Sequence, residues 1–321
     1  EAGVGPGMNG GFAGWKYYTA NELPAGERAI EIPHYIVELV KEVIGDGTVL
    51  NATDMFMHPV DGLRTVNSVD QLARFEFAAA HASQAVRNVL FNLSPGISEY
   101  QATQLMQLPA MPLSCHTMLS TGSRAFYGLP SPSDRKLAQG DPLTVAVGLR
   151  GGLTARAGFL VRKPSELNSS NRDYFEKLVG PYFTAIAEWY ETIGIGVPGG
   201  ELYDLIHRHL GDPFFGVTLT PGHLIHTDEW VNSPTFKNST CQLRSGMAIQ
   251  VDVIPATGSP YFTTNLEDTI VLADEQLREE MSSNYPDVWQ RVQMRREFYI
   301  NELNIHLKKE VLPFSNLPAY S

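Results

Sequence analysis

The sequence predicts an α+β fold, in which helices and antiparallel strands occupy separate stretches of the chain. Apolar residues recur with helical spacing over residues 69–93 and 170–193. Residues 143–161 have instead the pattern of two strands that meet at a Gly-Gly turn, which predicts a β-hairpin. Residues 247–253 and 267–273 are also strand-like, and the proline- and glycine-bearing loop between them allows an antiparallel pair.

The composition is that of an ordinary globular protein. The chain has 321 residues and is 43% hydrophobic, enough for one large domain with a small one, or for two medium domains. Its net charge is −11 and it has no basic stripe, which argues against nucleic acid as a partner. No apolar run reaches membrane-spanning length and no signal peptide is visible, so we expect a cytoplasmic protein without a membrane partner.

The two cysteines and the first residue bear on processing and compartment. Cys115 and Cys241 lie far apart in the sequence and fit a reducing cytosol, and the alternative is that they form one buried disulfide. The chain begins at Glu1 instead of Met, as expected of a fragment or a processed form.

Residues 1–62 are predicted to be the end of a smaller N-terminal domain, because their elements are too few for a core of their own. The glycine-rich residues 1–15 predict a loop, and the aromatic residues 14–18 a short strand. A helix is expected over residues 32–43, and a strand and turn over residues 48–56.

Residues 63–321 are predicted to form the larger domain. Capping boxes that begin at Ser68 and Ser98 predict helices to about residues 93 and 108. A strand that runs into a turn is expected over residues 113–122.

The second half of this domain begins with a long helix, which Ser170 is expected to cap. A shorter helix is predicted over residues 200–211, and two more over residues 274–281 and 286–307. The proline-bearing tail from residue 311 is expected to be irregular.

Two histidines, an aspartate and a glutamate stand out in the apolar, strand-like stretch between residues 220 and 272: His223, His226, Asp252 and Glu267. Strand alternation places Asp252 and Gln250 on the face opposite the apolar residues, and antiparallel pairing would bring Asp252 near Glu267. Buried carboxylates are costly unless they are paired or bound to a cation. Imidazole and carboxylate suit a transition metal or metal-free acid–base catalysis, and hydrogen-bonded structural carboxylates are an equal alternative.

The order of six motifs resembles a known family. They are LRTVNSVDQLARFEFAAAHASQAV, GISEYQA, TGSRAFYGLPSPSDRKLAQGD, GHLIHTDEW, SGMAIQVDVIP and LEDTIVL. Together they resemble the pita-bread family of methionine aminopeptidase, aminopeptidase P, prolidase and creatinase. The resemblance covers roughly residues 60–275 as one pita-bread domain, and residues 1–60 are similar to the end of the N-terminal domain in the creatinase and prolidase branch. It implies a homodimer.

The metallopeptidases of this family hold two metal ions with two aspartates, one histidine and two glutamates. By resemblance the histidine matches His223, one glutamate matches Asp252, and the other matches Glu267. His226 is expected to stand in for a second histidine, because the segment around it is shorter than in the family.

Three family positions lack their usual residue. The first aspartate falls on Ala146, the second on or near Arg156, and a further histidine on or near Leu129. No Asp or Glu lies between Asp141 and Glu166 to replace the aspartates. We therefore expect no dinuclear site and no cofactor beyond at most one weakly held divalent metal at the remaining ligands.

Three functions stay open. The first is hydrolysis of a small amide, peptide or guanidino C–N bond, without metal or with one ion. In it His223 acts as acid–base with support from His226, Asp252 and Glu267 orient water or a cationic group, and Arg156 and Gln250 bind the substrate. The second is a non-catalytic binding protein that keeps the fold, and the third a metal-dependent Xaa-Pro peptidase.

Overall fold

The computed structural model describes residues 3–20, 22–108, 110–230 and 232–316. The chain divides into two compact units, residues 1–65 and residues 66–321, and each is described by itself. Among the described residues, no helix has both the length and the apolar character needed to cross a membrane.

The N-terminal unit holds a two-stranded parallel sheet of β1 (Gly10–Phe12) and β2 (Val49–Asn51). Helix α1 (His34–Ile44) connects them, after a 3-10 turn at Gly26–Arg28, and the short α2 (Asp54–Met57) follows β2. The helix predicted over residues 32–43 and the strand predicted after residue 48 are therefore confirmed.

Two predictions for this unit are wrong. The glycine-rich segment is not all loop, because β1 pairs with β2 and Gly10 N donates to Thr48 O at 2.8 Å. Residues 14–18 form no strand. Their backbone is bonded to side chains instead: Gly14 N donates to Thr53 Oγ1 at 2.8 Å and Lys16 N to Glu31 Oε2 at 2.7 Å.

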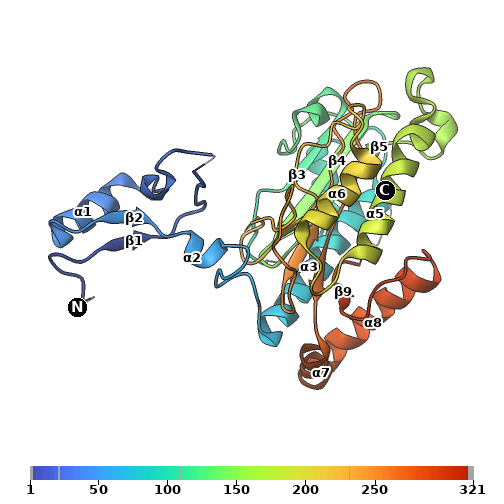
Figure 1. The fold of residues 1–321 in the computed structure, drawn as a ribbon. Coiled ribbons are helices and arrows are strands. Elements are labelled where there is room, and N and C mark those ends of the chain that lie inside the picture. The colour runs from blue at the N-terminus through green and yellow to red at the C-terminus, as the bar shows by residue number, and fades with distance from the viewer. Residues whose placement is uncertain (1–2, 21, 109, 231, 317–321) are drawn as a thin grey trace. The chain divides into compact units, whose positions relative to one another are not determined.

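A seven-stranded antiparallel sheet organises the larger unit (Figure 1). Its order is β3-β4-β5-β8-β7-β6, and β9 also pairs with β8. The strands are β3 (Met118–Thr121), β4 (Pro142–Leu149), β5 (Gly152–Phe159), β6 (His223–Leu224), β7 (Ala248–Val251), β8 (Asn265–Leu272) and β9 (Val311–Pro313). The predicted hairpin and the predicted antiparallel pair are confirmed, and β8 is the strand that joins them.

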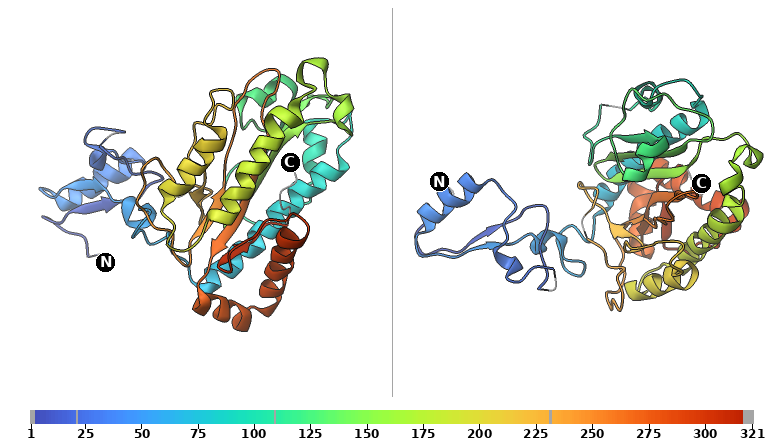
Figure 2. Two further views of the ribbon diagram at one scale, coloured as in Figure 1. Left: turned by 45° about the vertical axis from the view of Figure 1, so that its right-hand side comes forward. Right: turned by 90° about the horizontal axis from the view of Figure 1, so that it is seen from above.

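Long helices cover one face of this sheet (Figure 2). Helix α3 (Val69–Asn92) packs on β4 and β5, with the predicted capping box of Ser68 and Gln71 in place. Helix α5 (Gly180–Thr192) is bonded to β8, because Leu266 N donates to the hydroxyl of Tyr182 at 2.9 Å. The helices therefore leave the other face of the strands for the site described below.

The remaining helices follow the prediction with changed ends. Helix α4 (Glu99–Gln104) has its capping box but stops early. Ser170 lies in a 3-10 turn, and the long helix starts only at a π-helical turn, Phe175–Val179, that leads into α5. Helices α6 (Gly199–Leu210), α7 (Glu275–Asn284) and α8 (Pro286–Asn301) lie close to their predicted positions.

The C-terminal tail is not irregular throughout. Its strand β9 pairs Leu312 with Val271 and Pro313 with Ile270 at the edge of the sheet. An edge strand tolerates proline, because the missing N–H is not needed on its outer side. Pro313, one of the two prolines that predicted irregular structure, therefore lies in an edge strand, and Pro318 is outside the described residues.

Candidate active site

The sheet register brings the predicted carboxylates together. Val251, the last residue of β7, pairs with Asp268, so the next residue, Asp252, lies opposite Glu267. In β6, His223 pairs with Gln250 and completes the group. Among the described residues, His223, Asp252 and Glu267 are the one group of three such side chains whose ligand atoms all lie within 4.8 Å of one another.

The backbone at Gly222 positions His223. Gly222 has φ 114°, and a Cβ there would lie 2.9 Å from Gln250 O. Its carbonyl accepts hydrogen bonds from the hydroxyls of Ser233 at 2.8 Å and Thr235 at 2.7 Å. A glycine is therefore required before the histidine.

The imidazole of His223 faces three carboxylates. Its Nδ1 lies 3.1 Å from Leu224 O, which can only accept, so Nδ1 carries a proton and Nε2 is directed toward the acids. Nε2 lies 3.3 Å from Glu229 Oε1, 3.7 Å from Glu267 Oε1 and 3.9 Å from Asp252 Oδ2. We name these four residues the His223 cluster.

The cluster holds too little positive charge for its carboxylates. Burial alone would lower the pKa of His223, but hydrogen bonds to Glu229 and Glu267 and the charge of Asp252 outweigh it and raise this pKa well above its ordinary value. Burial, and next the charge of Glu267, raise the pKa of Asp252 well above its ordinary value. The imidazole of His223 and the carboxyl of Asp252 therefore both favour their protonated forms more than they would in water, which is the behaviour expected at a proton-transfer site.

Glu229 is not among the residues that the sequence predicted for the site. It lies in the loop that follows β6, where Leu224 N donates to Asn232 O at 2.6 Å and returns the chain toward the histidine. The available signal was an acidic residue on a short loop beside a candidate catalytic histidine.

Gln250 is in the site but does not have the position expected of a substrate contact. It is fully buried, and its Nε2 donates to Leu153 O at 2.9 Å and to Glu267 Oε1 at 3.3 Å. Its Oε1 accepts from the hydroxyl of Thr269. Gln250 therefore orients the carboxylate of Glu267.

His226 lies apart from the His223 cluster. A tight turn after β6, in which His226 N donates to Asp228 O, directs its ring toward α3. There its Nε2 is 3.3 Å from Gln71 Nε2, and the ring contacts Phe75 edge-on at 5.2 Å between centroids. The structure does not support the expected pairing of His226 with His223.

Arg156 lies on the opposite face of the sheet from the cluster. It pairs with Leu266 and shares the face of Asp268, whose Oδ2 accepts from its Nη2 at 2.6 Å. The buried guanidinium also donates to the carbonyls of Ala155 at 2.7 Å and Glu267 at 3.1 Å. Strand alternation therefore turns Arg156 away from the cluster, although it contributes to the lining of both cavities described below.

Three alanines occupy the sheet face that adjoins the cluster. Ala155 pairs with Glu267 on one side and with Ala146 on the other, and Ala157 follows on the same face. With Arg156 turned away, Ala157 is the residue near it that faces the site. Neither Ala146 nor Ala157 can supply a metal ligand.

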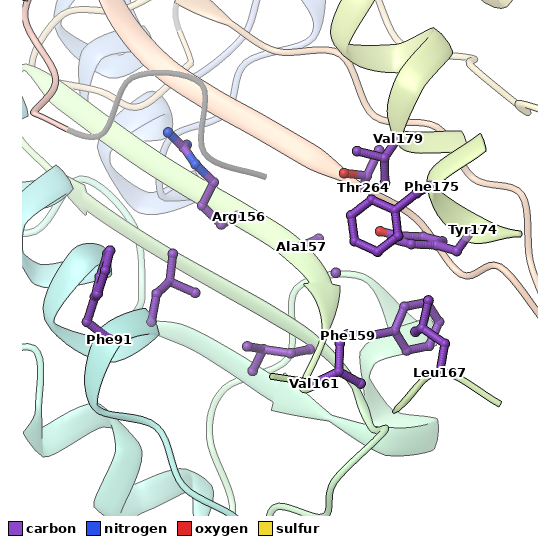
Figure 3. Close-up of a pocket in the computed structure, with 13 residues that line it drawn as sticks. Phe91, Arg156, Ala157, Phe159, Val161, Leu167, Tyr174, Phe175, Val179 and Thr264 are labelled. Carbon is purple, nitrogen blue, oxygen red and sulfur yellow. The ribbon is translucent and has the colours of Figure 1, made fainter. Parts of the chain in front are cut away.

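A cavity of about 390 Å³ lies over these alanines. A second cavity, of about 330 Å³, is lined from the side of α3 and the π-helical turn (Figure 3). Its walls include Phe91 and Phe175, and Arg156 also contributes to it (Figure 3). The first cavity lies next to the cluster, because Ala155, which pairs with Glu267, and Ile254 and Asn265, each two residues from a cluster carboxylate, are among its lining residues.

Comparisons with known proteins identify the fold. No protein-family model and no curated protein matches the chain. Among solved structures, the Xaa-Pro dipeptidase of Bacillus anthracis matches with a TM-score of 0.63 and 18% identity, over 78% of this chain and 69% of that one. The prolidase of Pyrococcus horikoshii OT3 matches with a TM-score of 0.61 and 17% identity, over 80% and 76%. The X-Pro aminopeptidase of Thermotoga maritima MSB8 gives 0.61 and 14%, over 76% and 69%.

The fold is the pita-bread fold. At these identities the likeness establishes architecture alone, and function has to be argued from the site. The similar structures named above are described as peptidases. We therefore ask whether the side chains of the His223 cluster could bind a metal ion.

The site fits one divalent ion by donor type. His223 Nε2 and oxygens of Asp252 and Glu267 are suitable ligands, and Asp252 Oδ1 is buried without a hydrogen-bond partner among the described residues. Ala146 and Ala157, on the sheet face next to these ligands, offer no side-chain donor for a further ion.

Proposed function

We propose that this chain is a hydrolase of a small C–N-bonded substrate that works without a dinuclear metal centre. The observation that carries the proposal is the single imidazole of His223, with Nε2 within 4 Å of three carboxylates, beside a cavity of about 390 Å³. A buried group of titratable residues at a cavity is the usual character of a proton-transfer site.

The residues have distinct roles in this proposal. His223 exchanges a proton at Nε2, and Glu229, the nearest carboxylate, keeps the ring charged or accepts its proton. Asp252 and Glu267 orient a water molecule, with Gln250 holding Glu267 in place. One divalent ion, where bound by His223, Asp252 and Glu267, would polarise the scissile group and acidify water.

The test is hydrolysis of a panel of dipeptides, Xaa-Pro peptides, creatine and related amides. We expect turnover of at least one compound, and a loss of about 10²- to 10⁴-fold in His223→Gln. His207→Gln is the matched control, because His207 lies on α6 with its Nδ1 2.9 Å from Tyr203 O. Full activity in His223→Gln would overturn the assignment.

The metal content of the protein distinguishes a hydrolase without metal or with one ion from a two-metal peptidase. Mass spectrometry of protein purified without chelator, and again after incubation with manganese, zinc or iron, should give no more than one equivalent per chain. Two equivalents would overturn the argument from Ala146 and Ala157 and restore a two-metal peptidase as the leading function.

A binding protein without catalysis is the second candidate. The observation that favours it is the run of Ala146, Ala155 and Ala157 across the floor of the cavity, which removes charge from the sheet face beside the cluster. Ligand binding together with no turnover across the panel would support this candidate over the hydrolase.

A further inference from the structure

The cavity beside the His223 cluster is apolar over most of its lining. Its floor is formed by the three alanines described above, and Met118, Phe126 and Phe262 contribute to its walls. The rings of Phe126 and Phe262 meet edge-on at 4.9 Å between centroids. Arg156 also contributes to the lining, but its side chain is buried and its guanidinium is paired with Asp268. The lining as a whole suits an aliphatic or aromatic group.

The mouth of the cavity is apolar as well. About half of the surface of Phe126, Leu129 and Leu219 is exposed, and all three line the cavity. Exposed apolar side chains around one cavity indicate that an apolar ligand enters there.

The polar end of the site holds buried oxygen atoms without hydrogen donors. Asn265 lines the cavity two residues before Glu267 and is only 7% exposed, yet its Oδ1 has no hydrogen-bond partner among the described residues. Asp252 Oδ1 is also buried without a hydrogen-bond partner among the described residues. A buried acceptor without a donor is unfavourable, and a ligand N–H would satisfy it.

The charges near this end favour a cation. Asp252, Glu229 and Glu267 surround the single imidazole of His223, so the carboxylates outnumber the cation even when that ring is protonated. The guanidinium of Arg156 does not compensate them, because it is held by Asp268 on the other face of the sheet. A free carboxylate on a ligand would therefore be repelled.

We propose that this site binds a compact cation with an apolar body: an ammonium or amidinium head at Asp252, Glu267 and Asn265, an aliphatic or aromatic body over the alanine floor, and no free carboxylate. That this ligand is also the substrate rests on the proposed function. Free dipeptides are then excluded as good substrates, because they carry a free carboxylate.

Calorimetry with small probes tests the proposal without any need for turnover. Phenethylamine should bind, ethylamine at least tenfold more weakly because it lacks the body, and phenylpropionate not measurably because it carries the opposite charge. Phenethyl alcohol, which has the body without the charge, should bind at least tenfold more weakly than phenethylamine. Equal binding of the acid and the amine, or no binding of phenethylamine, would overturn the proposal.

Variants separate the two ends of the ligand. Asn265→Leu should weaken phenethylamine binding about tenfold, and Ala146→Leu, which fills the floor, should abolish it. Val161→Phe is the matched control, because it fills the second cavity (Figure 3) and should leave binding unchanged. Thermal unfolding of each variant checks that it is folded, and unchanged binding in folded Ala146→Leu would contradict the assignment.

The outcomes distinguish this inference from the proposed function. Amine binding without hydrolysis of any C–N bond would remove the hydrolase and leave the ligand class intact. Hydrolysis restricted to peptides with a free carboxylate, with no amine binding, would leave the hydrolase and overturn the ligand class.

Discussion

Two neighbouring carboxylates on β8 meet opposite environments. Asp268 points to the helix-covered face and forms a buried pair with Arg156, Nη2 to Oδ2 at 2.6 Å. Glu267 points to the other face and shares one imidazole with Asp252 and Glu229. The first face is matched in charge, whereas the second has an excess of negative charge. Strand β8 therefore contributes one residue to an ion pair that stabilises the fold and one to a cluster that lowers its stability. A loss of stability of this kind is common at functional sites.

The largest effect is expected from breaking the matched pair. Burial raises the pKa of Asp268 to about 6 against the opposing charge of Arg156, so the carboxylate is ionised at pH 7. Asp268→Asn leaves the buried guanidinium without its anion, and the free energy of unfolding should fall by about 3–5 kcal/mol. Denaturant unfolding monitored by fluorescence measures this loss.

A paired replacement is the control for that prediction. Arg156→Met combined with Asp268→Leu removes both charges, and most of the lost stability should return, because an apolar pair replaces a buried ion pair at little cost. A loss below about 1 kcal/mol in the single variant would show that the pair is not what stabilises this face.

The sequence predicted much of the fold, because its signals there are local. The Ser68 capping box and the Gly151-Gly152 turn act within a few residues, and both appear as predicted. The predicted antiparallel pairing of the two strands also placed Asp252 near Glu267. The side-chain environments were harder, because they depend on distant partners. The orientation of Arg156 is set by its register with β8, far along the chain.

An intermediate effect is expected from Gln250. Gln250→Leu removes the donor to Glu267 and to Leu153 O, and the acceptor of the Thr269 hydroxyl. The free energy of unfolding should fall by about 1–3 kcal/mol, and kcat should fall more than KM changes, because Glu267 loses its orientation. Gln84→Leu is the control, since its partner Asn88 lies one turn away on the same half-buried stretch of α3. Equal losses in the two variants would contradict a positioning role.

The smallest effect should have the opposite sign. Asp252→Asn removes an ionisable carboxyl from the overcharged cluster, and at pH 7 the variant should be more stable than the wild-type chain, by about 1 kcal/mol.

The pH dependence identifies the cause of that gain. The pKa of Asp252 is raised in the folded chain, so its ionisation costs nothing below about pH 4, where the unfolded chain is protonated as well. As the pH rises, the unfolded chain releases this proton first, and the wild-type chain loses stability until the folded carboxyl also ionises. The advantage of Asp252→Asn should therefore be absent near pH 4 and grow toward neutral pH, measured by denaturant unfolding across that range. A variant less stable than the wild-type chain at pH 7 would mean that the Asp252 charge is compensated, as Asp268 is, and the contrast between the two faces of β8 would be lost.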